Sequence, residues 1–325
     1  MALRTRLTEA LDIRVPILLA PMGFAAGGKL AAAVTAGGGL GLIGGGYGDA
    51  EWLDREFAAA GNARVGCGFI TWSMAQRPEL LDRVLAHAPE AVMLSFGDPA
   101  PFAARIRDAG SRIICQVQTM AHARAALDCG ADIIVAQGTE AGGHGAVRGG
   151  MTLVPEVADL LARAAPDTLL VAAGGIADGR GLAAALMLGA DGVLIGSRLW
   201  ASPECLIHPN HQQAALAADG DATIRQLSAD IARGYDWPAE FTGRVLRNGF
   251  IARWHGNEAE HRAVADATRP AYLAAMAAGR SDEVGVFIGE AIGLMSEVEP
   301  AAEIVARIAE EAEALLRGRA AAMLA

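Results

Sequence analysis

The 325-residue sequence predicts an α/β protein, a (β/α)₈ TIM barrel with a small helical insert or lid domain. Short apolar runs alternate with Ala-rich helical stretches from about residue 17 to residue 200. Eight runs occur, and none alternates between polar and apolar residues, as expected of parallel strands buried on both faces. Two stretches, ARAALDCGADIIVAQG and LAAALMLGADGVLIGS, look like copies of one helix–loop–strand unit. An open doubly wound sheet is the competing architecture.

The individual elements follow from these runs and from the glycines between them. Several helical stretches end in a glycine that is followed by a new strand, as at Ala36-Gly37 and Leu188-Gly189, because glycine adopts the left-handed conformation at low cost. The expected strands are residues 17–21, 40–45, 64–70, 91–96, 112–117, 132–138, 169–175 and 192–197, and the expected helices are 28–36, 50–60, 77–88, 100–109, 120–129, 153–165 and 179–188.

The pattern changes after Ser202, which suggests a second domain. Residues 203–275 contain no strand candidates and most of the aromatic residues of the later chain. We therefore predict a barrel from residues 1–202 and 280–325, and a small helical substrate or lid domain at 203–279. The segment from about Glu283 is expected to be helical and to pack back on the barrel. The aromatic residues in 235–272 could shape the substrate pocket or a homodimer contact.

Composition excludes several classes of protein. The formal net charge of −10 disfavours binding to nucleic acid. The four cysteines, Cys67, Cys115, Cys129 and Cys205, form no CxxC pair, which disfavours a disulfide scaffold or a zinc site and fits a reducing cytoplasm. The first sixteen residues are charged throughout and lack the apolar core of a signal peptide, and apolar runs stop near ten residues, too short to span a membrane.

Two glycine-rich turns are the candidate phosphate site. Active sites of such barrels lie at the carboxyl ends of the strands, and phosphate sites recur after strands seven and eight. Gly174-Gly175 follows the seventh predicted strand and Gly196-Ser197 follows the eighth. Backbone N–H groups there could bind a phosphate, with the Ser197 hydroxyl as a further donor. The alternative is that these glycines only make tight turns.

The candidate base is His144, in the sequence Gly142-Gly143-His144-Gly145 after the sixth predicted strand. Small neighbours would let this imidazole approach a substrate and act as a general base near neutral pH. A lone histidine in a loop can equally be exposed polar surface.

Other strand ends could contact a flat ligand. Ala20-Pro21-Met22-Gly23 follows the first predicted strand, and the glycine admits a flat ligand close to the backbone. Gln116 and Gln137 end strands five and six, where their amides suit a flavin edge or could be satisfied within the core.

No metal site is predicted. His208 and His211 lack a third ligand nearby, and Asp178 and Asp191 lie at helix boundaries where capping or turn formation explains them.

Four segments carry a resemblance to a known family. LLAPMGF, AQGTEAGGHGA, AAGGIADGRGLAAALMLGADGVLIGSR and ECLIHP resemble the nitronate monooxygenase family, formerly called 2-nitropropane dioxygenases. The resemblance covers roughly residues 1–210 and continues more loosely to the C-terminus. The same superfamily includes FMN-dependent NADH:quinone reductases and enoyl-ACP reductases. The resemblance implies FMN in the barrel mouth beside a small helical domain.

The resemblance also implies residue roles. His144 matches the family's catalytic histidine. Met22 and its neighbours would contact the isoalloxazine ring, and the two glutamines with Gly143 would line its polar edge. The turns after strands seven and eight would hold the phosphate. The implied cofactor-binding residues are Ala20, Pro21, Met22, Gly23, Gly68, Gln116, Gln137, Gly143, Gly174, Gly175, Gly196 and Ser197.

Three functions remain open. The first is FMN-dependent oxidation of alkyl nitronates or nitroalkanes with O₂, with His144 as the base. The second keeps FMN but reduces a quinone or an enoyl thioester with NAD(P)H. The third is a redox-inactive barrel, an isomerase or synthase acting on a sugar phosphate.

Overall fold

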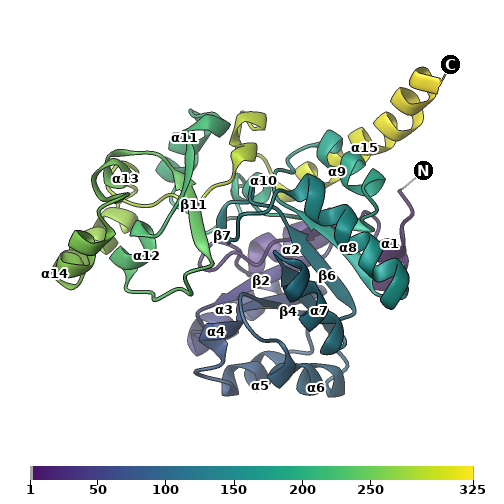
Figure 1. Ribbon diagram of the computed structural model, residues 1–325, viewed down its shortest axis with the longest axis horizontal. Helices are drawn as coiled ribbons and strands as arrows, with labels where there is room; N and C mark the ends of the chain where they lie inside the picture. Colours follow the sequence, from purple (N-terminus) through teal and green to yellow (C-terminus); the bar gives the residue numbers. More distant parts are fainter. Residues whose placement is uncertain (1–2, 325) are drawn as a thin grey trace.

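A computed structural model, which describes residues 3–324, confirms the predicted barrel of parallel strands (Figure 1). Hydrogen-bonded neighbours follow the order β1-β9-β8-β6-β5-β4-β3-β2. Two backbone hydrogen bonds of 3.0 Å, from Leu19 N to Leu40 O and from Leu40 N to Ile17 O, close the ring. The barrel strands are β1 (Ile17–Leu19), β2 (Gly41–Gly46), β3 (Val65–Ile70), β4 (Ala91–Ser95), β5 (Arg112–Val117), β6 (Ile133–Gln137), β8 (Leu169–Ala173) and β9 (Gly192–Ile195).

Helices cover the outside of the barrel. The last helix, α15 (Ala301–Leu324), packs against α9 and α2 and takes the place of the eighth barrel helix. It begins well after Glu283, where helix was predicted, because residues 283–300 hold a short 3₁₀ turn, η2 (Glu290–Leu294), and extended chain instead. The other covering helices are α2 (Gly28–Ala36), α3 (Ala50–Ala60), α4 (Thr71–Met74), α5 (Glu79–Leu85), α6 (Ala100–Asp108), α7 (Met120–Asp128), α8 (Gly150–Ala164), α9 (Gly179–Met187) and the short α10 (Ser197–Trp200).

Two apolar layers explain why the strands show no alternation. Side chains such as Leu18, Met93 and Val171 form one cluster inside the barrel. Their sequence neighbours pack outward against the helices in a second cluster. The short helix α1 (Arg6–Leu11) adds Leu7 and Leu11 to the inner cluster, so every strand has apolar surroundings on both faces.

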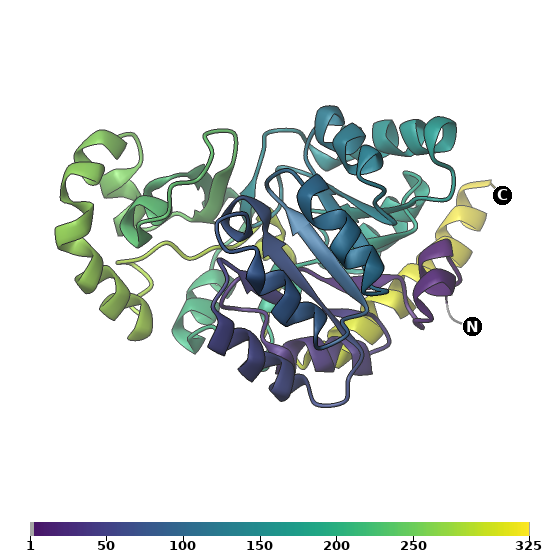
Figure 2. The same cartoon turned by 90° about the horizontal axis from the view of Figure 1, so that it is seen from below.

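Residues 203–300 form an insert that lies on the side of the barrel away from both termini (Figure 2). The prediction that this region contains no strands is wrong, because it contains β10 and β11. Two strands of the insert form an antiparallel sheet with β7 (Gly143–Gly145), which follows β6. The order is β10-β11-β7, so β11 pairs with both β10 and β7. The insert consists of α11 (Pro209–Leu216), η1 (Gly220–Ala222), β10 (Thr223–Gln226), α12 (Ser228–Arg233), β11 (Thr242–Leu246), α13 (Gly249–Trp254) and α14 (Glu258–Ala277).

Long-range pairing forms this second sheet, which is why local sequence did not reveal it. β10 and β11 are short and each contains arginine, so neither shows an apolar run. The returning chain also lies along β11, since Leu246 N donates to Val286 O at 2.8 Å. The division into a barrel and a separate lid domain stays a prediction. Within residues 3–324, no helix is both long enough and apolar enough to cross a membrane.

Candidate active site

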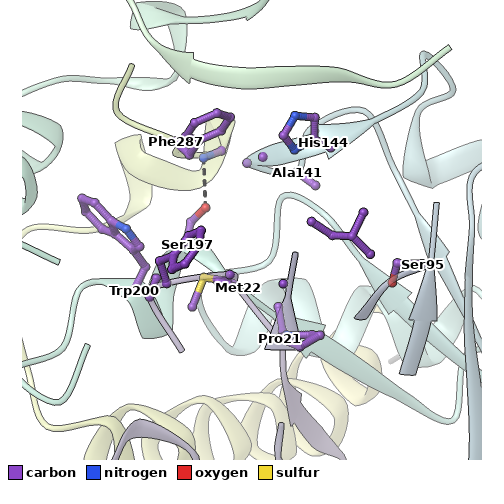
Figure 3. A pocket seen from close by; sticks show the side chains of 18 of the residues that line it. Pro21, Met22, Ser95, Ala141, His144, Ser197, Trp200 and Phe287 are labelled. Carbon is purple, nitrogen blue, oxygen red and sulfur yellow. Dashed lines mark hydrogen bonds between the residues drawn. The ribbon is translucent and has the colours of Figure 1, made fainter. Parts of the chain in front are cut away.

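One cavity at the carboxyl ends of the barrel strands is lined by every candidate site residue. Figure 3 shows part of this lining, including Met22, His144 and Ser197. The volume of the cavity is about 660 Å³, and the insert contributes part of its wall. The turns after β8 and β9 both reach it, and so does His144 from β7. The predicted residues that line it are Ala20, Pro21, Met22, Gly23, Gly68, Gln116, Gln137, Gly143, His144, Gly174, Gly175, Gly196 and Ser197.

The turn after β8 presents backbone donors to this cavity. Gly174 and Gly175 have φ values of 101° and 71°, a backbone conformation that residues other than glycine rarely adopt. Within the described chain, the amides of Gly174, Gly175 and Ile176 donate to no protein acceptor. A cluster of such amides is a natural anion site.

The turn after β9 adds a hydroxyl. Ser197 Oγ accepts a hydrogen bond of 2.9 Å from Gly289 N, the dashed line in Figure 3. This leaves the Ser197 O–H able to donate to a ligand.

Gly68 and Pro21 both line the cavity and lie directly against each other. A Cβ on Gly68 would lie 2.3 Å from Pro21 Cγ, so β3 and the turn after β1 can be this close only without a side chain at Gly68. Met22 and Gly23 continue the same surface.

The two glutamines play different parts. Gln137 Oε1 accepts hydrogen bonds of 2.9 Å from the amides of both Gln116 and Gln118, and Gln137 Nε2 donates to His144 O at 3.0 Å. Gln137 therefore ties β7 to the barrel, whereas the Gln116 oxygen remains available to a ligand.

His144 lies at the centre of a buried charged group. Its Nε2 is 2.8 Å from Asp230 Oδ2, and Arg233 Nη2 is 2.7 Å from Asp230 Oδ1. The side chain of His144 is 9% exposed and that of Asp230 is 2% exposed. β7 pairs with β11, placing His144 opposite Gly243, while α12 supplies both charged partners.

His144 has small neighbours in sequence, but aromatic rings from the insert pack against it in space. Its ring stacks on Trp237 at a centroid distance of 3.4 Å and an interplanar angle of 3°. The Phe287 ring lies 5.5 Å from the His144 ring between centroids and is tilted by 33° against it. The flanking glycines allow these aromatic rings to approach, so the imidazole is held rather than mobile.

The surroundings set the protonation state of the pair. Burial lowers the pKa of His144 below its usual value, although the Asp230 carboxylate opposes this. Burial alone would raise the pKa of Asp230, but the hydrogen bonds from His144 and Arg233 and the charge of Arg233 outweigh it and lower that pKa. Neutral His144 then donates Nε2–H to a charged Asp230. The lone pair is left on Nδ1.

Sequence reasoning missed Asp230, Arg233 and Phe287 at this site. Asp230 and Arg233 are spaced i, i+3 on α12, a pattern typical of an exposed helix pair. The pairing of β7 with β11 brings Asp230 and Arg233 close to His144, and no local sequence pattern predicts that pairing.

The histidines and aspartates interpreted as structural have structural partners. His208 Nδ1 accepts from Asn210 N at 3.1 Å, and His211 Nδ1 lies 2.8 Å from Ser281 Oγ. Asp178 caps α9, and Asp191 Oδ2 accepts from Leu170 N at 2.9 Å. Among the described residues, no three His, Cys, Asp or Glu side chains are grouped as a metal site.

The fold and the site define an enzyme of the (β/α)₈-barrel class with an anion-binding turn beside a buried histidine. The chain belongs to the nitronate monooxygenase family, whose model matches residues 69–311, and it is therefore an oxidoreductase of a family that is generally flavin-dependent.

Individual relatives agree with this placement. A nitronate monooxygenase from Metarhizium robertsii is 33% identical, with 97% of each chain covered. The solved structure of FabK from Thermotoga maritima gives a TM-score of 0.85 at 28% identity, covering 98% of this chain and 99% of that one. Nitroalkane oxidase from Streptomyces ansochromogenes gives a TM-score of 0.78 at 26% identity, covering 98% of this chain and 100% of that one.

Proposed function

We propose that this protein binds FMN in the barrel mouth and oxidises alkyl nitronates, and the nitroalkanes from which they form, with O₂. The observation that carries the proposal is one cavity lined both by turn amides that lack a protein acceptor and by the buried His144, whose pKa burial lowers. The names of the relatives from M. robertsii and S. ansochromogenes point to the same chemistry.

The residues of the cavity fit FMN. The amides of Gly174 and Gly175 and the hydroxyl of Ser197 would hold the phosphate. No side chain projects from Gly68 beside Pro21, which would leave room for a planar ring system, and the Gln116 oxygen suits its polar edge. When bound, FMN would take electrons from the nitronate and pass them to O₂.

The chain itself moves the proton. His144 Nδ1 would accept the proton from the carbon beside the nitro group, and the C–H electron pair would move into the nitronate. Asp230 would hold the tautomer that keeps Nδ1 unprotonated and would stabilise the imidazolium formed. Trp237 and Phe287 fix the ring and exclude water from it.

The substitution His144→Asn tests this assignment. The variant should retain FMN and oxidise preformed nitronates, because these have already lost the proton. Its kcat/KM for neutral nitroalkanes should fall by about 10²-fold or more, the usual contribution of a positioned base. Oxygen uptake measures the turnover of nitronates and of neutral nitroalkanes, and the visible spectrum measures bound FMN. Full turnover of neutral nitroalkanes by the variant would remove His144 as the base, and a purified protein that never takes up FMN would end the proposal.

A second candidate rests on the likeness to FabK, since FabK-like reductases share this superfamily. In that case the protein would use NAD(P)H to reduce an enoyl thioester or a quinone. Rapid anaerobic bleaching of bound FMN by NADH or NADPH would favour the second candidate, and slow bleaching with fast oxygen uptake on nitronates would favour the first. The cytoplasmic location and a homodimer remain predictions.

A further inference from the structure

A second cavity, of about 490 Å³, adjoins the first. The two spaces adjoin at four residues that line both, Phe24, Gly46, Tyr47 and Tyr235. We propose that this side cavity binds a neutral, planar aromatic substituent of the substrate while the nitronate carbon reacts beside His144. The proposal rests on the proposed function and narrows its substrate class.

The walls of the side cavity are unusually aromatic. Aromatic residues make up only 5% of the chain, yet five rings meet here. Tyr47 stacks on Tyr235 at 3.6 Å between centroids and 4° between planes. It also meets Trp72 edge-on at 6.2 Å, and Phe24 meets Trp52 edge-on at 6.4 Å. The two edge-on distances lie within the range of about 4.5–7 Å at which aromatic rings attract one another, and a ligand ring could join them in the same way.

Bare backbone forms another part of the wall, at Gly44, Gly45 and Gly46. A Cβ on Gly44 would lie 2.3 Å from Met22 O, and one on Gly45 would lie 2.9 Å from Gly68 O. Glycine at these positions lets β2 pack closely on the backbone of Met22 and Gly68, so this part of the wall is backbone without side chains.

Phe24 has a strained backbone conformation and a side chain that is exposed to the two cavities and solvent. Its φ is 61°, and its side chain is 48% exposed. A non-glycine residue in this conformation is strained, and strain of this kind gathers at ligand sites. The large ring at the rim of both cavities is positioned to cover a bound aromatic group.

The charges around the side cavity favour a neutral substituent. Among the described residues that line it, Arg77 is the one cation, and its Nη2 donates to the backbone oxygens of Tyr47 and Gly48 rather than pointing free into the cavity. The remaining charged side chains there, Asp49 and Asp236, are acidic and would repel a phosphate or carboxylate. Burial raises the pKa of the Tyr47 hydroxyl, which therefore remains neutral.

Two nitronates that differ only in their tail test the proposal, those of (2-nitroethyl)benzene and 1-nitrobutane. We expect the holoenzyme to prefer the phenyl compound by about tenfold in kcat/KM, the size of effect given by one aromatic stacking contact. Trp52→Leu and Trp72→Leu should move this ratio toward one, whereas Trp72→Phe should preserve it. Trp254→Leu, which removes an indole outside both cavities, should leave the ratio as it was. A ratio near one in the unaltered holoenzyme would overturn the proposal, as would a ratio that Trp52→Leu and Trp72→Leu leave intact.

A binding measurement separates this inference from the proposed function. Calorimetric titration of the holoenzyme with 2-phenylethanol should show binding that Trp52→Leu weakens about tenfold and Trp254→Leu does not. If nitronates are not oxidised but this binding pattern is found, the proposed function fails and the aromatic site stands. If nitronates are oxidised and 2-phenylethanol does not bind, the aromatic site fails alone.

Discussion

Asp230 is the residue on which the basicity of His144 depends. Asp230→Asn removes the charge that stabilises the imidazolium while keeping an oxygen that can accept from Nε2–H. We expect kcat/KM for neutral nitroalkanes to fall about 10²-fold, with a much smaller effect on preformed nitronates. Steady-state oxygen uptake on the two substrate forms measures the difference.

A control is needed because Asp230→Asn also leaves the buried Arg233 without its anionic partner. Breaking a buried pair costs about 3–5 kcal/mol, so the variant should unfold at lower denaturant concentration. The double variant Asp230→Asn/Arg233→Met removes the orphaned charge and should regain stability without regaining rate. Recovery of the rate in the double variant would show that Asp230 acts only on stability.

The pH profile gives a second test at His144. Burial lowers its pKa, so the neutral base persists below the ordinary histidine value of about 6.5. We expect kcat/KM for neutral nitroalkanes to be level above pH 6.5 and to fall only at lower pH, whereas preformed nitronates should lack this limb. Since the Asp230 carboxylate raises the pKa of His144, Asp230→Asn should move this acid-side fall in kcat/KM to still lower pH. A limb above pH 6.5 in the unaltered enzyme would contradict the assignment.

Single residues were predictable where a backbone pattern marked them. His144 stands out because glycines surround it after the sixth strand, and it lines the same cavity as both glycine turns. Its neighbours were not predictable. Asp230 and Trp237 are far from it in sequence, and the stacked ring that holds it reaches it only through folding of the insert.

At the scale of elements, the turn after β8 can be tested against a matched turn elsewhere. Gly175 and Gly110 have φ values of 71° and 79°, so alanine should strain both similarly, at about 1 kcal/mol or more. Gly175 lines the cavity, and a Cβ on Gly110 would meet nothing within 4 Å. We expect only Gly175→Ala to lower the molar ratio of FMN to protein, measured by absorbance after gel filtration. Equal FMN content in the two variants would mean that this turn does not hold the phosphate.

Strands of the barrel were predictable and those of the insert were not, for one physical reason. Barrel strands bury both faces, so each appears as an apolar run such as Ile133–Gln137. β7 is the tripeptide Gly143–Gly145, and β11 carries Gly243 and Arg244. Neither segment has the composition of a strand, so each becomes a strand only by pairing with the other.

At the scale of the molecule, repetition made the fold predictable. Helix–glycine–strand units follow one another along the chain, and parallel strands in that number close into a barrel. The last helix was displaced by the insert, yet α15 still packs between α9 and α2, where the repeat requires a covering helix. What repetition did not specify is the other wall of the cavity, which comes from the insert.

Because barrel and insert enclose one cavity, its ligand should stabilise the whole chain. FMN at about 100 times its Kd should add about 2.7 kcal/mol to the free energy of unfolding of the apoprotein. This raises Tm by roughly 5 °C for a chain of this size. Riboflavin has the same ring system without the phosphate, so at equal concentration it should raise Tm far less, because the amides of Gly174 and Gly175 would have no anion to bind. Thermal unfolding monitored by circular dichroism makes the comparison. Equal shifts with the two compounds would show that the ring is bound but that the glycine turn does not grip the phosphate.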